Sequence, residues 1–119
     1  IGTAEIYRQV EKLPEVADSL VVGEPVGDDV QVLLLVVMAP GQALTAEIEQ
    51  RIRRTVRDNA SPRHVPRRIV AVPDIPYTRS GKKVEIAVAR MLQGREPGNR
   101  EALANPASLD QIRSALQSE

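Results

Sequence analysis

The feature that most constrains this chain is an almost unbroken apolar run, VQVLLLVVMAP, between Val30 and Pro40. The run has the length of one β-strand and lacks the alternation of polar and apolar residues that marks a half-exposed strand. A strand of this composition is typically buried on both faces. Because the chain contains no Phe or Trp, the core around this strand must consist of Val, Ile, Leu and Ala.

Two further strands are predicted, one on each side of this run in the sequence. Residues 15–26 have the composition of a strand, which we expect to close at Gly23 and Pro25. The short Gly-Asp-Asp link that follows predicts an antiparallel hairpin with the apolar run. The segment RRIVAVP, residues 67–73, predicts a third and shorter strand.

The clearest helix is predicted over residues 45–59, where Thr45 can serve as the N-cap. Three apolar residues recur there at intervals of four positions: Ile48, Ile52 and Val56. Residues with this spacing share one face of a helix. This helix should therefore pack its apolar stripe against the sheet.

Two shorter helices are expected before and after it. The first covers residues 3–13, with Thr3 as its N-cap. The second covers residues 85–94, with Gly94 at its C-terminal end. Helical spacing predicts that its inward face comprises Ile86, Ala89 and Met91 or Leu92.

The sequence after Gly94 is polar and rich in turn-forming residues, so residues 95–107 should wrap over the surface or be mobile. A last helix is expected near Ser108, because Ser108 and Gln111 have the spacing of a capping box. Together these elements predict an α+β fold, with a small sheet of about three strands, a hairpin plus one, covered by helices.

Charge is distributed unevenly along the chain, although the formal net charge is +0. Residues 1–50 contain nine acidic and two basic residues, whereas residues 51–83 contain ten basic and two acidic ones. This segregation predicts a basic surface that attracts an anion. The alternative is a set of solvated side chains on a helix and in loops.

Several kinds of site are disfavoured. The chain has no cysteine, which excludes disulfides and cysteine-ligated zinc and fits a reducing compartment such as the cytoplasm, where we expect the protein. No segment approaches about 18 consecutive apolar residues, so we expect no membrane-spanning helix. His64 is interpreted as structural, and Asp28 and Asp29 as a hairpin turn, so no metal site is predicted. Ile1 is not an initiator residue, so we expect a fragment or a processed product.

The segment DIPYTRSGKKVEI, residues 74–86, carries the strongest functional signal. A phosphate-binding P-loop is excluded, because Pro76 stands where that motif needs Gly and no hydroxyl residue follows Lys82. Two interpretations remain: a plain polar turn, or a rigid turn that presents a lysine to an anionic reaction centre. A preorganised cation of that kind can stabilise the charge of a transition state.

This segment resembles the C-terminal lysine motif, Pro-x-Thr-x-Ser-Gly-Lys, of the AMP-forming acyl-CoA synthetases, which belong to the acyl-adenylate-forming superfamily. The matching residues are Pro76, Thr78, Ser80, Gly81 and Lys82. The beginning of the chain, IGTAEIY, is similar to the end of the family's hinge-proximal motif, without the preceding Gly-x-Arg. The order of helix, hairpin, helix, strand and lysine loop also resembles the small, mobile C-terminal domain of these enzymes.

Within the superfamily, the chain resembles the acetoacetyl-CoA synthetases in particular. Those enzymes place Lys-Lys-x-Glu after Ser-Gly, as at residues 82–85, and carry an Asn-Arg-x-x-Leu-Ala-Asn-Pro tail, as at residues 99–106. The resemblance implies that residues 1–94 form the catalytic-lysine domain and residues 95–119 an extension with a short helix. Another short-chain acyl-CoA synthetase is an alternative, as is a basic module that binds nucleic acid or another anion.

The resemblance implies a ligase that joins acetoacetate to CoA while ATP is converted to AMP and pyrophosphate. Lys82 would serve the first half-reaction, in which the acyl adenylate forms, and Thr78, Ser80 and Gly81 would support its loop. The fragment alone is expected to be inactive and to bind neither ATP nor CoA. The accompanying Mg²⁺ would be held on a large N-terminal domain, which is the implied partner.

The second half-reaction would use another face of the same domain after rotation about a hinge. The resemblance implies that this face includes Gly2 and Thr3, with Arg57 near the CoA nucleotide. Lys82 is also expected as a site of reversible acetylation, with a lysine acetyltransferase and a deacetylase as partners. Lys83 should point away from Lys82, although we expect both lysines to be solvent-accessible.

Nucleic acid is disfavoured as a partner. Proteins that bind single strands combine basic residues with aromatic side chains on which bases stack. Only two aromatic residues occur in the whole chain, Tyr7 and Tyr77.

Overall fold

A computed structural model describes residues 3–118, and three strands make up the sheet within these residues. They are β1 (Val16–Val26), β2 (Asp29–Met38) and β3 (Arg68–Ala71), in the spatial order β1-β2-β3. β1 and β2 form the antiparallel hairpin that was predicted, and β3 pairs with β2 in parallel. A parallel neighbour requires a crossover connection, which the helix between β2 and β3 provides.

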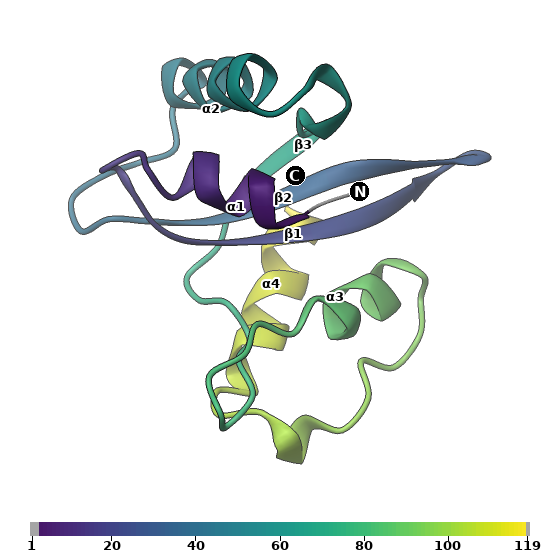
Figure 1. Cartoon of the computed structure of the whole chain (residues 1–119). Coiled ribbons are helices and arrows are strands. Elements are labelled where there is room, and N and C mark those ends of the chain that lie inside the picture. Colours follow the sequence, from purple (N-terminus) through teal and green to yellow (C-terminus); the bar gives the residue numbers. More distant parts are fainter. Residues whose placement is uncertain (1–2, 119) are drawn as a thin grey trace.

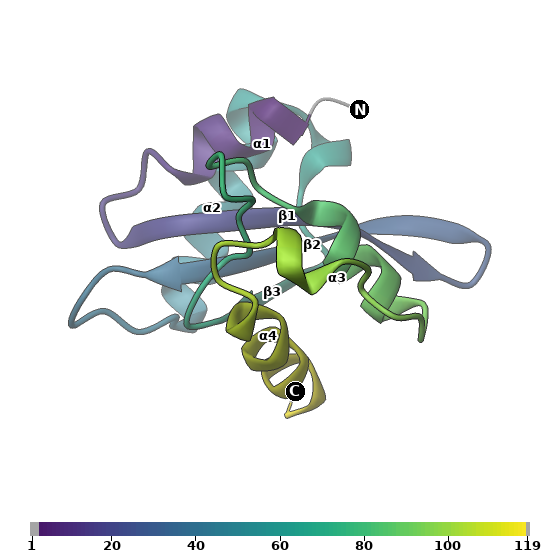
Figure 2. The same ribbon diagram turned by 90° about the horizontal axis from the view of Figure 1, so that it is seen from below.

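Helices cover both faces of this sheet. In Figures 1 and 2, α1 and α2 lie on one face, whereas α3 and α4 lie on the other. The predicted α+β class, with a sheet of three strands covered by helices, is confirmed. The helices are α1 (Thr3–Val10), α2 (Ala46–Asn59), α3 (Glu85–Leu92) and α4 (Ala107–Gln117).

The apolar run at residues 30–40 forms most of the central strand β2. Leu33 and Leu35 belong to the core beneath α3 and α4, whereas Leu34 and Val36 belong to the core beneath α1 and α2. All four side chains are 0% exposed, as expected of a strand that is covered on both faces. Val30, at the start of the same run, is 67% exposed, because the tip of the hairpin extends past the helices (Figure 2).

Helix α2 matches its prediction closely. The Thr45 hydroxyl accepts a hydrogen bond from the Ile48 amide at 3.2 Å and thereby caps the helix. The predicted stripe of Ile48, Ile52 and Val56 is buried. The N-cap and the apolar stripe predicted from the sequence are therefore both present in α2.

Two predicted boundaries were wrong. Thr3, expected as an N-cap, is the first residue of α1, and that helix ends at Val10 rather than three residues later. Strand β1 continues through Gly23 and Pro25 to Val26. Proline is tolerated there because β1 is an edge strand of the sheet, where a missing N–H can face solvent.

The predicted inward face of α3 was also wrong at its first position. Ile86 is 60% exposed, whereas Ala87 and Val88 are buried. Helix α3 packs on β1, and Ala87 and Val88 join the apolar cluster that contains Leu20 of that strand. Gly94 does follow the helix end, with a φ of 74° after the C-cap residue Gln93.

The predicted capping box at α4 does not form. Pro106 occupies the N-cap position without a side-chain cap. Ser108 lies inside the first turn, where it is buried and donates a hydrogen bond to the Asn105 carbonyl at 2.8 Å. Ser108 therefore lies two residues after the N-cap position and does not occupy that position itself.

The segment after Gly94 contributes to the core. Leu103, Leu109 and Ile112 are at most 5% exposed and belong to the same apolar cluster as Leu20 and Leu33 of the sheet. Helix α4 packs on α3 and β3. Residues 95–118 therefore help to cover one face of the sheet.

Candidate functional site

The lysine motif forms a tight turn, here called the lysine loop and defined as residues 77–83. Tyr77 and Lys83 pair as an antiparallel bridge at its base. The Thr78 amide donates to the Lys82 carbonyl at 2.8 Å, and the Gly81 amide donates to the Thr78 carbonyl at 2.9 Å. Gly81 has a φ of 88°, a conformation that glycine adopts without the strain other residues incur. Backbone hydrogen bonds within the loop therefore hold its conformation.

Two hydroxyl side chains of the motif hold this turn from inside. The Thr78 hydroxyl accepts a hydrogen bond from the Lys82 amide at 3.0 Å and lies 3.0 Å from the Ser80 hydroxyl. The Thr78 hydroxyl thus satisfies the Lys82 amide, and Ser80 contacts that hydroxyl. Their expected role in supporting the loop is compatible with this geometry.

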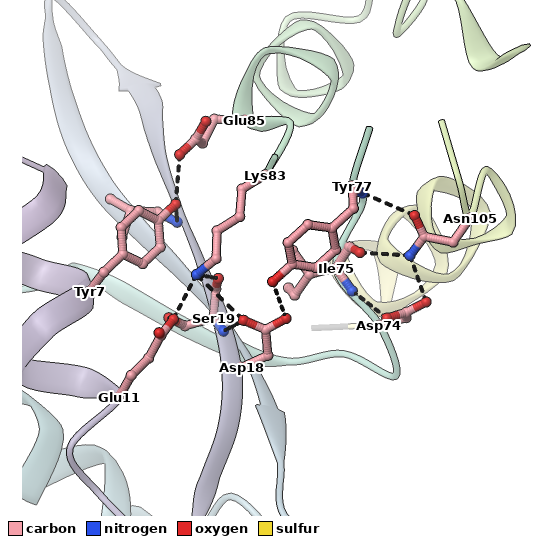
Figure 3. A network of polar contacts seen from close by, with 11 residues as sticks. Tyr7, Glu11, Asp18, Ser19, Asp74, Ile75, Tyr77, Lys83, Glu85 and Asn105 are labelled. Carbon is pink, nitrogen blue, oxygen red and sulfur yellow. Dashed lines mark hydrogen bonds and ion pairs between the residues drawn. The ribbon is translucent and has the colours of Figure 1, made fainter. Parts of the chain in front are cut away.

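The two consecutive lysines lie in different environments. Lys82 is exposed, and within residues 3–118 its ammonium has no hydrogen-bond or ion-pair partner. The ammonium of Lys83 contacts Glu11 Oε2 at 2.6 Å and the Ser19 carbonyl at 2.7 Å (Figure 3). With a side chain that is 19% exposed, Lys83 is not freely accessible, so that expectation was wrong.

Further contacts enclose the Lys83 ammonium. It lies 3.4 Å from Asp18 Oδ1 and 3.8 Å from the centre of the Tyr7 ring. A cation over an aromatic face is attracted by the electron density of the ring. Lys83 thus joins the lysine loop to β1 and to the chain that follows α1.

Both tyrosines of the chain take part in this polar network (Figure 3). Tyr7 donates its hydroxyl proton to Glu85 Oε2 at 2.7 Å and accepts from the Val21 amide at 2.9 Å. Tyr77 donates to Asp18 Oδ2 at 2.6 Å. Burial raises the pKa of Tyr7 and of Tyr77 far above the ordinary value, and the adjacent carboxylates raise each pKa further.

The segment after α3 also reaches the lysine loop. The Ala104 amide donates to the Tyr77 carbonyl at 2.9 Å, and the Arg79 guanidinium donates twice to the Glu101 carbonyl. The Asn105 side chain accepts from the Tyr77 amide at 2.9 Å. Sequence reasoning assigned no role to Asn105, although it belongs to the tail at residues 99–106 that supported the resemblance.

The residues expected near CoA are less informative. Gly2 lies outside the described residues, and Thr3 is exposed at the start of α1. Arg57 is exposed on α2, with its Nε 3.4 Å from Asp58 Oδ1. Within residues 3–118, no hydrogen bond joins Thr3 or Arg57 to the lysine loop.

Part of the positive charge in the basic segment, residues 51–83, has partners within the domain. Several of its arginines are held by acidic side chains or by carbonyl groups of the same chain. These arginines and their partners are Arg51 with Glu15, Arg53 with Glu49, Arg68 with Glu24, and Arg79 with the Glu101 carbonyl.

Other candidate sites receive little support. His64 Nδ1 is within hydrogen-bond distance of the Ser61 hydroxyl in a short 3₁₀ turn, Pro62–His64, which agrees with a structural role. Asp28 and Asp29 lie at the hairpin turn, and residues 3–118 contain no group of three potential metal ligands. In that same part of the chain, no helix has both the length and the apolarity to cross a membrane.

Comparison with known proteins shows to which family the chain belongs. Residues 6–82 match the family model described as AMP-binding enzyme C-terminal domain. The acetoacetyl-coenzyme A synthetase of Rhizobium meliloti (strain 1021) is 54% identical over 110 residues, which are 92% of this chain and 17% of that protein. The acetoacetyl-CoA synthetase of Caenorhabditis elegans is 53% identical over 112 residues, which are 92% of this chain and 16% of that protein.

A solved structure shows the same fold. The acetoacetyl-CoA synthetase from Streptomyces lividans superposes on 100% of this chain with a TM-score of 0.86 and 39% sequence identity, and the match covers 18% of that structure. The chain thus spans a small part of the length of the proteins it matches. It belongs to the family of AMP-binding enzyme C-terminal domains.

Proposed function

We propose that this chain is the lysine-bearing domain of a larger ATP-dependent acid–CoA ligase and that Lys82 acts in adenylate formation. In that step a carboxylate oxygen of the acid forms a bond to the α-phosphorus of ATP. The bond from that phosphorus to the bridging oxygen breaks, and pyrophosphate leaves with its electron pair. The thiolate sulfur of CoA then bonds to the acyl carbon, and AMP leaves.

The observation that carries this proposal is the exposed ammonium of Lys82, which has no partner within residues 3–118 and lies on a turn held by hydrogen bonds. The first step brings two anions together, and like charges 4 Å apart repel by about 4 kcal/mol at an effective dielectric constant near 20. A compact ammonium between the acid and the α-phosphate offsets that repulsion. Lys83 is unsuited to this task, because its ammonium is already bound to Glu11 and the Ser19 carbonyl.

The acid that we propose is acetoacetate. The support is the name shared by the matched relatives from Rhizobium meliloti and Caenorhabditis elegans, together with the tail at residues 99–106. Another short-chain acid is the alternative. Rates of adenylate formation with acetate, propionate and acetoacetate, measured on the full-length protein, distinguish the two.

The second half-reaction would use residues away from the lysine loop. We propose Gly2 and Thr3 for the face that meets CoA, and Arg57 for its nucleotide, because Arg57 is an exposed cation. We assign Mg²⁺ and the main contacts to ATP to a large N-terminal domain of the same protein. The 119-residue chain alone is therefore expected to catalyse neither half-reaction.

Lys82 is also the proposed target of a lysine acetyltransferase and a deacetylase. Acetylation would remove the charge of the ammonium, so it would suppress adenylate formation without altering the fold. The exposure of Lys82 and the enclosure of Lys83 support modification at the first lysine rather than at the second.

A module that binds nucleic acid is the rival function. The Tyr7 ring already carries the Lys83 ammonium and the Tyr77 ring packs against the apolar core, and six arginines of the basic segment have internal partners. These contacts leave few groups that could stack on bases or follow a phosphate backbone. Absence of oligonucleotide binding at low salt would remove this rival.

The decisive experiment separates the two half-reactions in the full-length protein. Lys82→Ala should lower the rate of adenylate formation by about 10²–10³-fold and leave thioester formation from supplied acyl adenylate unchanged. Lys12→Ala is the matched control, because the Lys12 ammonium contacts only Gln9 within residues 3–118. Equal loss in both half-reactions would show that Lys82 has a different role.

A further inference from the structure

The Asn105 side chain connects the C-terminal segment to the stretch that leads into the lysine loop. Its Oδ1 accepts from the Tyr77 amide at 2.9 Å. Its Nδ2 donates to Asp74 Oδ2 and to the Ile75 carbonyl, each at 2.7 Å (Figure 3). Both ends of this one amide group therefore have partners on the stretch that leads into the loop, residues 74–77.

These contacts replace the hydrogen bonds that a neighbouring strand would supply. Pro73 and Pro76 carry no amide hydrogen, and Ile75 is 0% exposed, so this stretch has few other ways to satisfy its backbone. A buried carbonyl or amide without a partner is costly. The Asn105 amide satisfies one carbonyl and one N–H there, and it also holds the Asp74 carboxylate.

The same C-terminal segment continues along the loop beyond Tyr77. Thr78 pairs with Leu103 as an antiparallel bridge, and the Ala104 amide donates to the Tyr77 carbonyl. The lysine loop therefore lies against residues 103–105 on one side, while Lys83 anchors its other end to Glu11. Because the Thr78 amide also bonds the Lys82 carbonyl, a shift at Tyr77 is transmitted to Lys82.

We propose that Asn105 is a positioning residue for Lys82. Asn105 itself lies in a segment outside the family match, which covers residues 6–82. The inference rests on the proposed function of Lys82. Asn105 holds Tyr77 in place, and Tyr77 begins the turn that carries the Lys82 ammonium. Loss of the Asn105 amide leaves Lys82 present but less well oriented, which affects the half-reaction that uses this lysine and spares the other.

The first test measures amide hydrogen exchange in the 119-residue chain. Asn105→Ala should speed exchange at Tyr77 and Lys82 by about tenfold, with no change at Leu34 in the central strand. Asn59→Ala is the matched control, because that asparagine is exposed and bonds only its own helix at the Thr55 carbonyl. Unchanged exchange at Tyr77, or an equal increase at Leu34, would overturn the proposal.

A pair of substitutions tests the hydrogen bond without removing volume. Asn105→Asp keeps the acceptor for Tyr77 but loses both donors and places a second carboxylate against Asp74. It should raise exchange at Tyr77 as Asn105→Ala does. When Asn105→Asp is combined with Asp74→Asn, the side-chain amide at position 74 can donate to the carboxylate at position 105, which reverses the direction of the original hydrogen bond. The double variant should therefore recover part of the protection of the Tyr77 amide against exchange. No recovery in the double variant would count against the assigned contact.

The second test uses the full-length protein and its two half-reactions. Asn105→Ala should lower kcat for adenylate formation by about tenfold, leave the KM for ATP near its original value and spare thioester formation. In a Lys82→Ala background it should cause no further loss, since both residues act through one group. Full additivity of the two losses would overturn the positioning role.

The two proposals fail in different ways. If Lys82→Ala retains full adenylate formation, the proposed function of Lys82 is wrong, whatever Asn105 does. If Lys82→Ala abolishes that step and Asn105→Ala leaves it intact, the proposed function holds and the positioning role of Asn105 is wrong.

Discussion

The ammonium of Lys83 lies 2.6 Å from a carboxylate oxygen of Glu11, a residue 72 positions earlier in the chain. This ion pair joins the end of the lysine loop to the segment after α1. Because Lys83 is held on that side, the preceding residue, Lys82, faces solvent. Lys83 is thus held within the domain, whereas Lys82 is exposed.

We expect Lys83→Met to destabilise the domain and Lys82→Met to have almost no effect. Removing the Lys83 ammonium leaves Glu11, Asp18 and the Ser19 carbonyl without their cation, which should cost about 1–3 kcal/mol of unfolding free energy. Lys82 is exposed and should change that energy by about 0.5 kcal/mol or less. Urea denaturation of both variants measures the difference. Equal midpoints would contradict the structural role of Lys83.

Chemical acetylation should distinguish the same two lysines. The ammonium of Lys83 is enclosed by the carboxylates of Glu11 and Asp18, which restrict the access of a reagent to it. With limiting acetic anhydride, Lys82 should therefore be modified before Lys83, as followed by mass spectrometry of peptides. The combined variant Glu11→Gln and Asp18→Asn should raise the reactivity of Lys83. Equal labelling of both lysines in the original chain would refute the expectation.

The tyrosines should report unfolding at alkaline pH. The ordinary pKa of tyrosine is about 10, and burial raises the pKa of Tyr7 and Tyr77 well above it in the folded state. Their contribution to stability is therefore complete below pH 10 and declines as pH rises above that value. Because the chain has no Trp, near-ultraviolet absorbance follows phenolate formation directly.

We expect this phenolate band to appear together with the loss of helical circular dichroism. In the chain unfolded by urea, both tyrosines should instead ionise near the ordinary pKa of tyrosine. If both tyrosines ionise near pH 10 while the helical signal is intact, the hydrogen bonds of Tyr7 and Tyr77 are not those described.

Helix α4 should contribute to stability as much as the helices on the other face. Ile112 of α4 and Ile52 of α2 are each 0% exposed. Replacing either by Ala leaves a cavity that should cost about 2–5 kcal/mol. Thermal or urea unfolding should remain a single transition in both variants. An unchanged midpoint for Ile112→Ala would mean that residues 95–118 are not part of the cooperative core.

Local chemistry determined the elements that the sequence predicted well. The stripe of Ile48, Ile52 and Val56 and the cap at Thr45 lie within one segment, so their consequences are visible in the sequence alone. The same is true of the buried strand β2 and of the turn from Thr78 to Lys82. At these positions the preferred local conformation and the tertiary environment agree.

Tertiary structure alone decided the environments of the side chains around the lysine loop. Lys83 finds its carbonyl partner at Ser19, 64 positions away, and Asn105 finds Ile75, 30 positions away; no periodicity within one segment encodes such pairs. The orientation of α3, which exposes Ile86, likewise depends on how the helix packs against β1. The sequence determined which lysine motif is present, and the packing of distant segments decided which of its two lysines is exposed, because a charged side chain pairs with whatever the fold brings within reach.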